Sequence, residues 1–347
     1  MRVLRVAMAL TLGAPLVLGF GTSGVASPVR AETVGAKPSA GCKAAAVAPG
    51  VQRVDTTSGG TARWYVRHVP PAYDGRKPTP LVVDLHGYLE GAELHETNSK
   101  LGAFGDANGF VTITPQGSGD VVPGWEVERD APDVRFVGDL LDEAGRTLCL
   151  DDRRVYVTGF SGGAFLASTV ACVYADRIAA IAPVAALRDP PGCKPARPVP
   201  IVTFAGTGDE FVAFTGGLGA RGQVTPANDG TGRMLGETSG GALVTRSPSM
   251  PKITAVWAKR NGCAAKPKET SVAADVTLVR YRCPKRVDVE LYRIDGAGHT
   301  WPGSEFSRQI ESFVGPTTFS INANEVMWSF FQAHPLRAGS RTGRSTR

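Results

Sequence analysis

The chain has 347 residues, of which 42% are apolar and 20% are charged, so it is long enough to bury one large hydrophobic core or two smaller ones. We expect one main folded domain. The formal net charge is +6 at pH 7, but four arginines without any acidic residue among them close the chain, at positions 337, 341, 344 and 347. This end predicts a disordered basic tail over 336–347. We expect no nucleic-acid partner, because no basic stripe interleaved with aromatic residues is present.

The first 31 residues have the composition of a secretory signal peptide. A positively charged start is followed by an apolar run over 6–20 and by a stretch of small residues, with candidate cleavage sites after Ala26 and Ala31. The apolar run is shorter than the roughly 20 residues that a membrane-spanning helix needs. We therefore expect a secreted, extracellular protein without stable membrane insertion. A linker over 32–49 would then lead into a domain over 50–335.

Six cysteines in an exported chain favour disulfide bonds, because the extracellular environment is oxidising. Six cysteines allow 15 pairings, and some of them could instead be buried thiols. Closure of short loops, and elimination for the last pair, predicts Cys172–Cys193, Cys263–Cys283 and Cys42–Cys149. Lipid attachment at Cys42 is a minor alternative. We expect no metal site, because the sequence contains no C-x-x-C pair or cluster of histidines and cysteines.

Short apolar runs rich in β-branched residues, bounded by Gly, Pro, Asp or Asn, predict strands along the chain. They cover 63–68, 81–85, 110–114, 155–158, 201–204 and 289–294. Helical spacing of apolar residues covers 134–148, 163–174 and 323–333. Because strands and helices alternate, the fold class is α/β: a mostly parallel, twisted sheet with helices on both faces. We expect the first strands to form an antiparallel edge.

A candidate nucleophile lies where one of these strands meets a helix. The strand over 155–158 leads directly into Gly159-Phe160-Ser161-Gly162-Gly163, and an alanine-rich helix follows. This G-x-S-x-G pattern between a strand and a helix predicts a sharp, strained turn that exposes Ser161 above the sheet. Glycines at 159 and 163 would let the strand and the helix approach without a Cβ clash.

A serine hydroxyl is a weak nucleophile and needs a base that a third group orients. Among the five histidines, only His299 combines a late position with a glycine-rich loop after a predicted strand. Asp209 follows the strand over 201–204 and gives the order serine, acid, histidine that this motif favours, so we predict it to be the acid. Glu210 and Asp295 are the competitors, although Asp295 lies only four residues before His299 and its position favours a turn residue.

An acyl-transfer site also needs donors for the oxyanion that develops on the carbonyl oxygen. The backbone N–H of Gly162 supplies one candidate. The second is the N–H of Tyr88, which follows the strand over 81–85 in the segment Leu85-His86-Gly87-Tyr88. His86 would then have a structural role.

Taken together, these motifs resemble the polyhydroxybutyrate depolymerase and feruloyl esterase family of secreted α/β-hydrolases over roughly residues 50–335. The matching segments are Leu85–Gly87, Gly124–Glu126, Gly159–Gly163, Gly206–Asp209, Gly298–Gly303 and Glu325–Phe331. The resemblance implies the α/β-hydrolase fold and extracellular hydrolysis of carboxylic esters without a metal or organic cofactor. It supports Asp209 as the acid. It also implies that Trp125 and Trp301 flank the substrate acyl or aryl group, while core aromatic residues are the alternative.

Two departures from the family bear on the substrate. Tyr88 stands where the family often has cysteine, and the glycine-rich segment 211–251 has no counterpart in it. This segment contains a formal G-x-G-x-x-G, but Gln223–Pro226 does not suit the helix that a dinucleotide site requires. We predict a lid or an inserted surface loop.

The leading functional hypothesis is a secreted serine esterase, most simply a monomer, acting through an acyl-enzyme on a small-molecule or polymeric ester. Feruloyl or acetyl esters of plant polysaccharide, polyhydroxyalkanoate oligomers and small esters are the candidate substrates. A serine peptidase of the same fold and an inactive hydrolase-like binding protein are the alternatives.

Overall fold

The structure is a computed structural model that describes residues 35–119, 122–227, 232–237 and 247–337. The described residues belong to one compact unit. The predicted signal peptide and most of the predicted basic tail lie outside the described residues. Within the described ranges, no helix is both long and apolar enough to cross a membrane.

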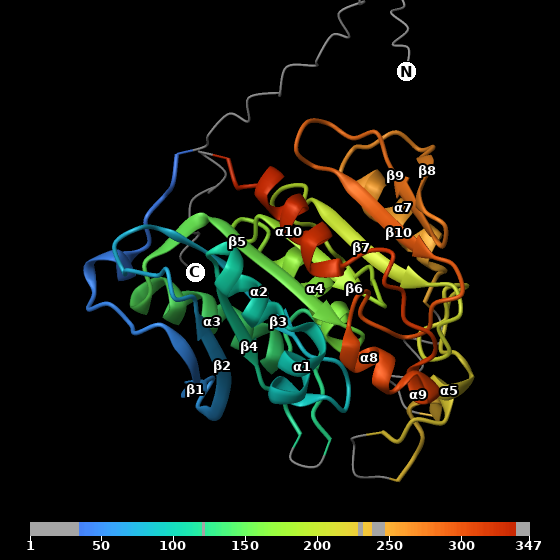
Figure 1. Ribbon diagram of the computed structural model, residues 1–347, viewed down its shortest axis with the longest axis horizontal. Helices are drawn as coiled ribbons and strands as arrows, with labels where there is room; N and C mark the ends of the chain where they lie inside the picture. The colour runs from blue at the N-terminus through green and yellow to red at the C-terminus, as the bar shows by residue number, and fades with distance from the viewer. Residues whose placement is uncertain (1–34, 120–121, 228–231, 238–246, 338–347) are drawn as a thin grey trace, which may run out of the picture. The chain divides into compact units, whose positions relative to one another are not determined.

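One mixed sheet organises the described part of the chain (Figure 1). Its strands lie in the spatial order β1 (Gly50–Ser58), β2 (Thr61–Val69), β4 (Val111–Pro115), β3 (Thr79–Leu85), β5 (Leu150–Phe160), β6 (Ala180–Val184), β7 (Ile201–Gly206), β10 (Val289–Ile294), β9 (Val276–Arg280) and β8 (Lys268–Ala273). The central strands from β4 to β10 run parallel. Antiparallel strands flank them on both sides.

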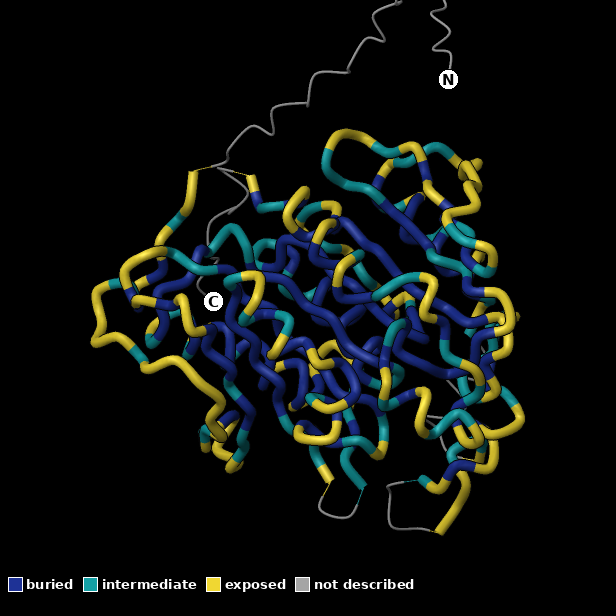
Figure 2. The backbone as a smooth tube through the Cα atoms, in the orientation of Figure 1, coloured by how far each residue is buried: buried dark blue, intermediate teal, exposed yellow. Residues whose placement is uncertain are grey.

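Side chains of the central strands alternate between two hydrophobic layers, as the pleat of a strand requires. In β5, Val155 and Val157 belong to one layer and Tyr156 to the other. The first layer is covered by α3 (Pro132–Thr147), α4 (Gly162–Val173) and α7 (Met250–Arg260), and the second by α2 (Leu101–Asn108) and α10 (Ala323–Ala333). Figure 2 shows the resulting buried centre of the sheet between exposed loops. The predicted α/β class, with helices on both faces, is confirmed.

Shorter helices surround the lower end of the sheet in Figure 1. They are α1 (Gly91–Ser99), α5 (Ala220–Gln223), α8 (Glu305–Gln309) and α9 (Glu311–Val314). All strands and helices predicted above are present, and β1 and β2 form the predicted antiparallel edge. The prediction does not include β1, β6, β8 or β9. Strands β1 and β8 are largely exposed edge strands, and β6 is rich in alanine. Strand β9 is rich in β-branched residues and was missed.

Three disulfide bonds join the six cysteines in the predicted pairing: Cys42–Cys149, Cys172–Cys193 and Cys263–Cys283. Two of them close loops of about 20 residues, with sequence separations of 21 and 20. The bond from Cys42 spans 107 residues. Loop closure in the unfolded chain makes such long-range bonds the more stabilising ones.

The segment before β1, which the sequence suggested was a linker, is held against the domain. It contains the 3-10 helix η1 (Ala40–Lys43) and the Cys42–Cys149 bond. The Ser39 hydroxyl donates to the carbonyl oxygen of Leu148 at 2.7 Å, and the same hydroxyl oxygen accepts the N–H of Leu150 at 2.9 Å. The segment before β1 therefore holds the start of β5 in place.

Candidate active site

Ser161 occupies a strained turn between β5 and α4. Its backbone has φ 53° and ψ −112°, a conformation that costs non-glycine residues free energy and often marks functional sites. The glycines on either side are required by space. A Cβ on Gly159 would lie 2.7 Å from the backbone of Gly163, and a Cβ on Gly163 would lie 2.1 Å from the carbonyl oxygen of Leu85. The turn therefore has the geometry that the G-x-S-x-G pattern predicted.

His299 and Asp209 are brought together by neighbouring parallel strands, since Asp209 follows β7 and His299 follows β10. The Nδ1 atom of His299 lies 2.7 Å from Oδ2 of Asp209, and both side chains are buried. The other carboxylate oxygen, Oδ1, accepts hydrogen bonds from the N–H groups of Phe211 and Val212 at 2.8 and 2.9 Å. The carboxylate is therefore held in one orientation.

Neither competitor for the acid reaches the imidazole. Glu210 is exposed and pairs with Arg221 at 2.6 Å, and Asp295 is exposed and pairs with Arg293 at 3.2 Å. The imidazole of His299 itself lies between aromatic rings, with the ring centroids of Phe160 and Phe211 at 4.8 and 5.1 Å. These rings fix the plane of the imidazole.

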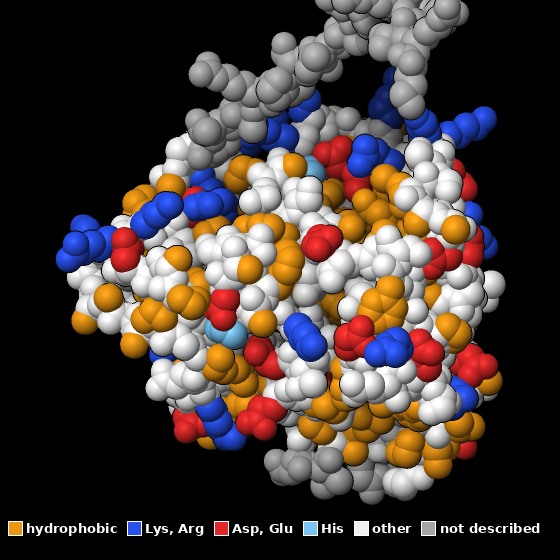
Figure 3. Space-filling model, in the orientation of Figure 1, with side chains coloured by type: hydrophobic (Ala, Val, Ile, Leu, Met, Phe, Trp, Pro, Cys, Tyr) orange, Lys and Arg blue, Asp and Glu red, His pale blue; other side chains and the backbone are white. Residues whose placement is uncertain are grey.

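Ser161 and His299 line one cavity of about 750 Å³, together with Tyr88, Gly162 and Trp125. Most of the remaining wall is apolar: Leu89, Leu94, Val127, Phe160, Phe165, Phe211, Val212, Leu218, Leu235, Phe306, Ile310, Phe313 and Val314. Hydrophobic side chains also gather on the outer surface around α8 and α9 (Figure 3). The structure contains no hydrogen bond between the described side chains of Ser161 and His299, a contact that is often long before substrate binds.

The backbone of Gly162 and the backbone nitrogen of Tyr88 lie close together beside Ser161. A Cβ built on Gly162 would lie 3.5 Å from the backbone nitrogen of Tyr88, so the two predicted oxyanion donors are neighbours. Gly162 is also the first residue of α4, where the helix dipole favours negative charge.

His86 has the structural role that the sequence predicted. Its Nδ1 lies 2.7 Å from the carbonyl oxygen of Gly87, and its Nε2 accepts the N–H of Gly117 at 2.8 Å. One nitrogen donates and the other accepts, so the ring is neutral. Burial lowers the pKa of His86 to about 4. The ring packs against Trp125 at 4.5 Å between centroids, and the Nε1–H of Trp125 donates to the His86 carbonyl oxygen at 2.8 Å.

The same architecture is found in a solved structure of acetyl xylan esterase from Aspergillus awamori. The two chains superpose with a TM-score of 0.51 over 75% of this chain and 97% of that chain, at 14% sequence identity. The chain has the α/β-hydrolase fold. No protein-family model matches its sequence.

Sequence relatives of this α/β-hydrolase are named as esterases and depolymerases. It is 31% identical to feruloyl esterase B from Piromyces equi over 239 residues, which cover 66% of this chain and 41% of that protein. It is 27% identical to the putative esterase NocK from Nocardia uniformis subsp. tsuyamanensis over 78% of this chain and 79% of that protein. Poly(3-hydroxyalkanoate) depolymerase C from Paucimonas lemoignei matches at 31% identity over 34% of this chain and 30% of that protein.

These relatives confirm the resemblance found in the sequence. This α/β-hydrolase nevertheless spans less than half the length of feruloyl esterase B.

Only one of the two tryptophans predicted to flank the substrate lines the cavity. Trp125 is half-buried and lines the cavity. Trp301 does not line it, and this part of the prediction needs correction. Its side chain is 1% exposed, and its Nε1–H donates to Oδ1 of Asn324 at 3.0 Å. Trp301 is therefore a core aromatic residue, and the polar N–H at the edge of its ring has a partner inside the protein.

The described part of segment 211–251 forms one wall of the cavity. Phe211, Val212 and Leu218 line the cavity. The Tyr88 hydroxyl donates to the carbonyl oxygen of Pro226 at 2.9 Å, which ties the segment to the candidate oxyanion loop. The G-x-G-x-x-G glycines fold back on the chain, since a Cβ on Gly219 would lie 2.3 Å from the carbonyl oxygen of Glu210. Residues 228–231 and 238–246 of the segment lie outside the described residues.

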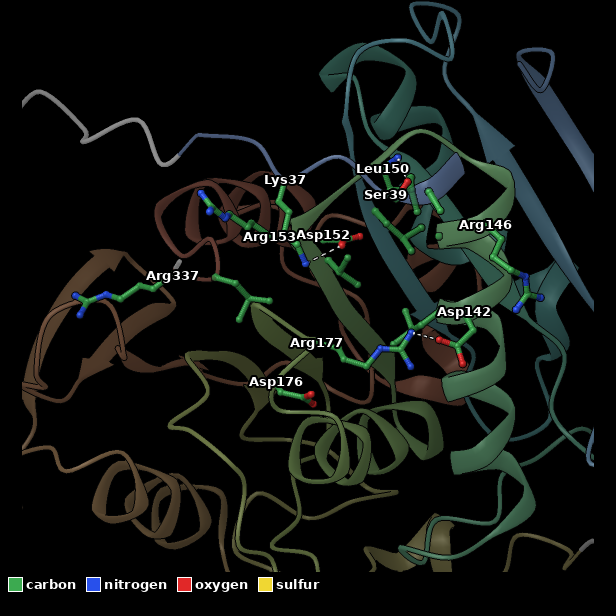
Figure 4. A pocket seen from close by; sticks show the side chains of 16 residues that line it. Lys37, Ser39, Asp142, Arg146, Leu150, Asp152, Arg153, Asp176, Arg177 and Arg337 are labelled. Atoms are coloured by element: carbon green, nitrogen blue, oxygen red, sulfur yellow. Dashed lines mark hydrogen bonds and ion pairs between the residues drawn. The ribbon is translucent and has the colours of Figure 1, made fainter. Parts of the chain in front are cut away.

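A second cavity, of about 440 Å³, lies where β5 begins, at the end of the sheet opposite Ser161 (Figure 4). Leu150, the first residue of β5, lines it. Ion pairs between Lys37 and Asp152 and between Arg177 and Asp142 lie in its wall, at 3.1 and 2.8 Å. The cavity contains none of the residues predicted to be catalytic. Among the described residues, no group of three or more His, Cys, Asp or Glu is arranged to hold a metal ion.

Proposed function

We propose that this α/β-hydrolase is a serine carboxylic-ester hydrolase, with Ser161 as nucleophile, His299 as general base and Asp209 as the acid that orients the base. One observation carries the proposal. The buried hydrogen bond between His299 and Asp209 lies at the cavity that also contains Ser161 in its strained turn. Relatives named feruloyl esterase, acetylxylan esterase and poly(3-hydroxyalkanoate) depolymerase support ester hydrolysis.

The geometry suits a two-step reaction. Nε2 of His299 takes the proton from Oγ of Ser161 while Oγ attacks the carbonyl carbon of the ester. The tetrahedral oxyanion collapses, the bond to the alcohol oxygen breaks, and the alcohol leaves with the proton from Nε2. Water then attacks the acyl-serine with His299 again as base, which releases the carboxylic acid and restores Ser161.

Two backbone N–H groups would stabilise the oxyanion, from Tyr88 and Gly162. Removal of one such donor in a hydrolase costs about 3 kcal/mol of transition-state stabilisation. Asp209 would stabilise the positive imidazole that forms in each step, because its carboxylate stays within hydrogen-bond distance of Nδ1.

The cavity supports an ester with an apolar acyl or aryl group. Its wall is lined mainly by aliphatic and aromatic side chains, and Trp125 stands beside Gly162. We propose feruloyl or acetyl esters of plant polysaccharide, polyhydroxyalkanoate oligomers and small soluble esters as the substrate class. The three disulfide bonds support export to an oxidising compartment.

A panel of esters tests the proposal. It contains short p-nitrophenyl esters, methyl ferulate, acetylated xylan and a suspension of polyhydroxybutyrate, each with the wild type and with Ser161→Ala. We expect turnover of at least one ester by the wild type and none above background by the variant. Retained turnover in Ser161→Ala would remove Ser161 from the mechanism, and a wild type inactive on all esters but active on peptides would favour a peptidase.

A further inference from the structure

A largely buried polar network lies next to the loop that carries Tyr88 and reaches the wall of the candidate cavity. We call it the buried relay, and its members are Asp84, Glu90, His95 and Asn98. Asp84 and His95 are 0% exposed, and Asn98 is 3% exposed. Asp84 lies on β3, and His95 and Asn98 lie on α1.

His95 bridges two carboxylates inside the protein. Its Nδ1 lies 2.9 Å from Oε2 of Glu90, and its Nε2 lies 2.8 Å from Oδ1 of Asp84. Both ring nitrogens therefore donate, and the ring is an imidazolium. Burial opposes this charge, but the two adjacent carboxylates outweigh burial and raise the pKa of His95 to about 10. Because each ion has hydrogen-bonded partners, the network is a fixed structure rather than a solvated cluster.

Glu90 connects this ion cluster to the candidate oxyanion loop. Its Oε2 accepts the N–H of Gly87 at 2.7 Å, and its own N–H donates to the carbonyl oxygen of Gly87 at 3.2 Å. The turn between them contains Tyr88 and Leu89. Leu89 has φ 74°, a left-handed conformation that normally favours glycine or asparagine at this position of a turn. Such strain persists only where the surrounding contacts over-determine the backbone.

Asn98 extends the same network to the loop of the general base. Its Nδ2–H donates to Oε1 of Glu90 at 2.6 Å. Its Oδ1 accepts from the hydroxyls of Ser304 and Ser307, each at 2.9 Å. Both serines lie in the segment that follows His299. One connected set of hydrogen bonds therefore runs from the loop of Tyr88 to the segment after His299.

We propose that the buried relay positions the catalytic groups: His95 holds Glu90, Glu90 holds the strained turn that aims the Tyr88 N–H, and Asn98 keeps that turn in register with the histidine loop. The relay residues are positioning residues, because they act through Gly87, Tyr88 and the segment after His299. The inference rests on the function proposed above.

Two variants test the relay, His95→Gln and Glu90→Gln. A glutamine at 95 has both of its donors on one nitrogen, so its amide oxygen would face one of the two carboxylates, and it carries no positive charge. A glutamine at 90 keeps the size of the side chain but directs an N–H₂ group at the donors of His95 or Asn98. We expect kcat for a p-nitrophenyl ester to fall about 10²-fold in each, with KM within about threefold, because misplacement of an oxyanion donor acts on the transition state.

A control variant and an inhibitor separate positioning from general stability. His68 on β2 is also a largely buried histidine beside carboxylates, at 3.0 Å from Asp106 and 4.0 Å from Glu96, and neither of these partners belongs to the loop of Tyr88. His68→Gln should keep kcat within about threefold of the wild type. An aryl trifluoromethyl ketone forms a tetrahedral serine adduct that needs the oxyanion donors. Its affinity should fall in His95→Gln and Glu90→Gln by a factor similar to the fall in kcat.

Two results would overturn the proposal. One is near-wild-type kcat and inhibitor affinity in a folded His95→Gln or Glu90→Gln protein, with folding checked by circular dichroism. The other is an equal loss in His68→Gln, which would indicate a general loosening of the fold. If His95→Gln does not fold, the isosteric Glu90→Gln variant decides. Failure of the proposed function would be seen separately, as turnover retained by Ser161→Ala.

Discussion

Asp209→Asn is the substitution whose effect follows most directly from the geometry. The carboxylate has three partners: Oδ2 faces Nδ1 of His299, and Oδ1 accepts from the N–H groups of Phe211 and Val212. Asparagine offers one oxygen and one N–H₂ group in place of two oxygens. The substitution therefore changes the hydrogen bonds and leaves the shape of the side chain almost unchanged.

The two backbone donors decide which way the new amide points. If the amide oxygen faces Phe211 and Val212, the N–H₂ group faces His299 and requires an unprotonated Nδ1. The opposite orientation would leave two partly buried N–H groups facing a donor, at about 1–3 kcal/mol each. The first orientation is thus favoured by roughly 2–6 kcal/mol. His299 then carries its proton on Nε2 and cannot accept one from Ser161.

We expect kcat to fall about 10³- to 10⁴-fold in Asp209→Asn, with little change in KM. This fall corresponds to about 4–5.5 kcal/mol, since each tenfold change in rate is about 1.4 kcal/mol. Initial rates with p-nitrophenyl acetate over a range of concentrations give both constants. Glu210→Gln is the matched control, because Glu210 is exposed and pairs with Arg221 instead of His299. It should retain wild-type kcat.

A kcat for Asp209→Asn within tenfold of the wild type would refute this reasoning, provided that thermal unfolding shows a native-like protein. If Asp295→Asn lost activity in the same assay, the acid would have to be reassigned to Asp295. A Glu210→Gln variant that lost activity would reassign it to Glu210.

Three further predictions concern stability. Gly163→Ala places a Cβ 2.1 Å from a backbone oxygen and should destabilise the folded protein by about 3 kcal/mol or more. Gly145→Ala on α3 meets open space and should stabilise the folded protein by about 0.5–1 kcal/mol. Equal midpoints of urea unfolding for the two variants would contradict the packing argument. Replacing both cysteines of the Cys42–Cys149 pair by serine should lower the free energy of unfolding by about 1.5 kcal/mol more than the same replacement of the Cys263–Cys283 pair. The reason is that the two closed loops span 107 and 20 residues. The reverse order in urea unfolding would count against loop closure as the cause. Burial lowers the pKa of His86 to about 4 from its ordinary 6.5, so the unfolded chain takes up this proton first as the pH falls. The difference in pKa contributes about 3 kcal/mol to the free energy of unfolding; this contribution is complete above pH 6.5 and is lost as the pH falls towards 4. Urea unfolding at pH 4.5 and 7.5 should therefore show a smaller difference for His86→Gln than for the wild type, and an unchanged difference would refute the linkage.

The central strands were predictable because their local composition and their tertiary environment agree. The segments 155–158 of β5 and 201–204 of β7 are apolar and rich in β-branched residues, and both are buried between two helical layers. β6 was not predictable, since its sequence Ala-Ile-Ala-Pro-Val has few strand-forming residues and a proline in the interior of the sheet. Pro183 is accommodated there opposite Gly159, and its carbonyl oxygen accepts the hydroxyl of Thr203 at 2.8 Å.

The candidate triad was predictable because each member follows the carboxyl end of a predicted parallel strand, where such sheets place their sites. The buried relay was not predictable. Helix α1 has mostly polar residues without an apolar face, which is typical of a solvated loop. One side of α1 is buried, because His95 is bonded to Asp84 and Asn98 to Glu90. These contacts join polar side chains, so they leave no hydrophobic periodicity in the sequence.

Trp301 illustrates a different limit, because a specific motif indicates importance without indicating contact. The segment Gly298–Gly303 is held by close packing: a Cβ on Gly298 would lie 2.1 Å from the carbonyl oxygen of Val314, to which the His299 N–H donates at 2.7 Å. Within this segment, the buried side chain of Trp301 is held by its hydrogen bond to Asn324. The motif therefore fixes the position of His299. We expect substrate selection to depend on other walls of the cavity, formed by Trp125 and the described part of segment 211–251. Substitutions there should change which ester is preferred, whereas substitutions in Gly298–Gly303 should lower the rate for every ester.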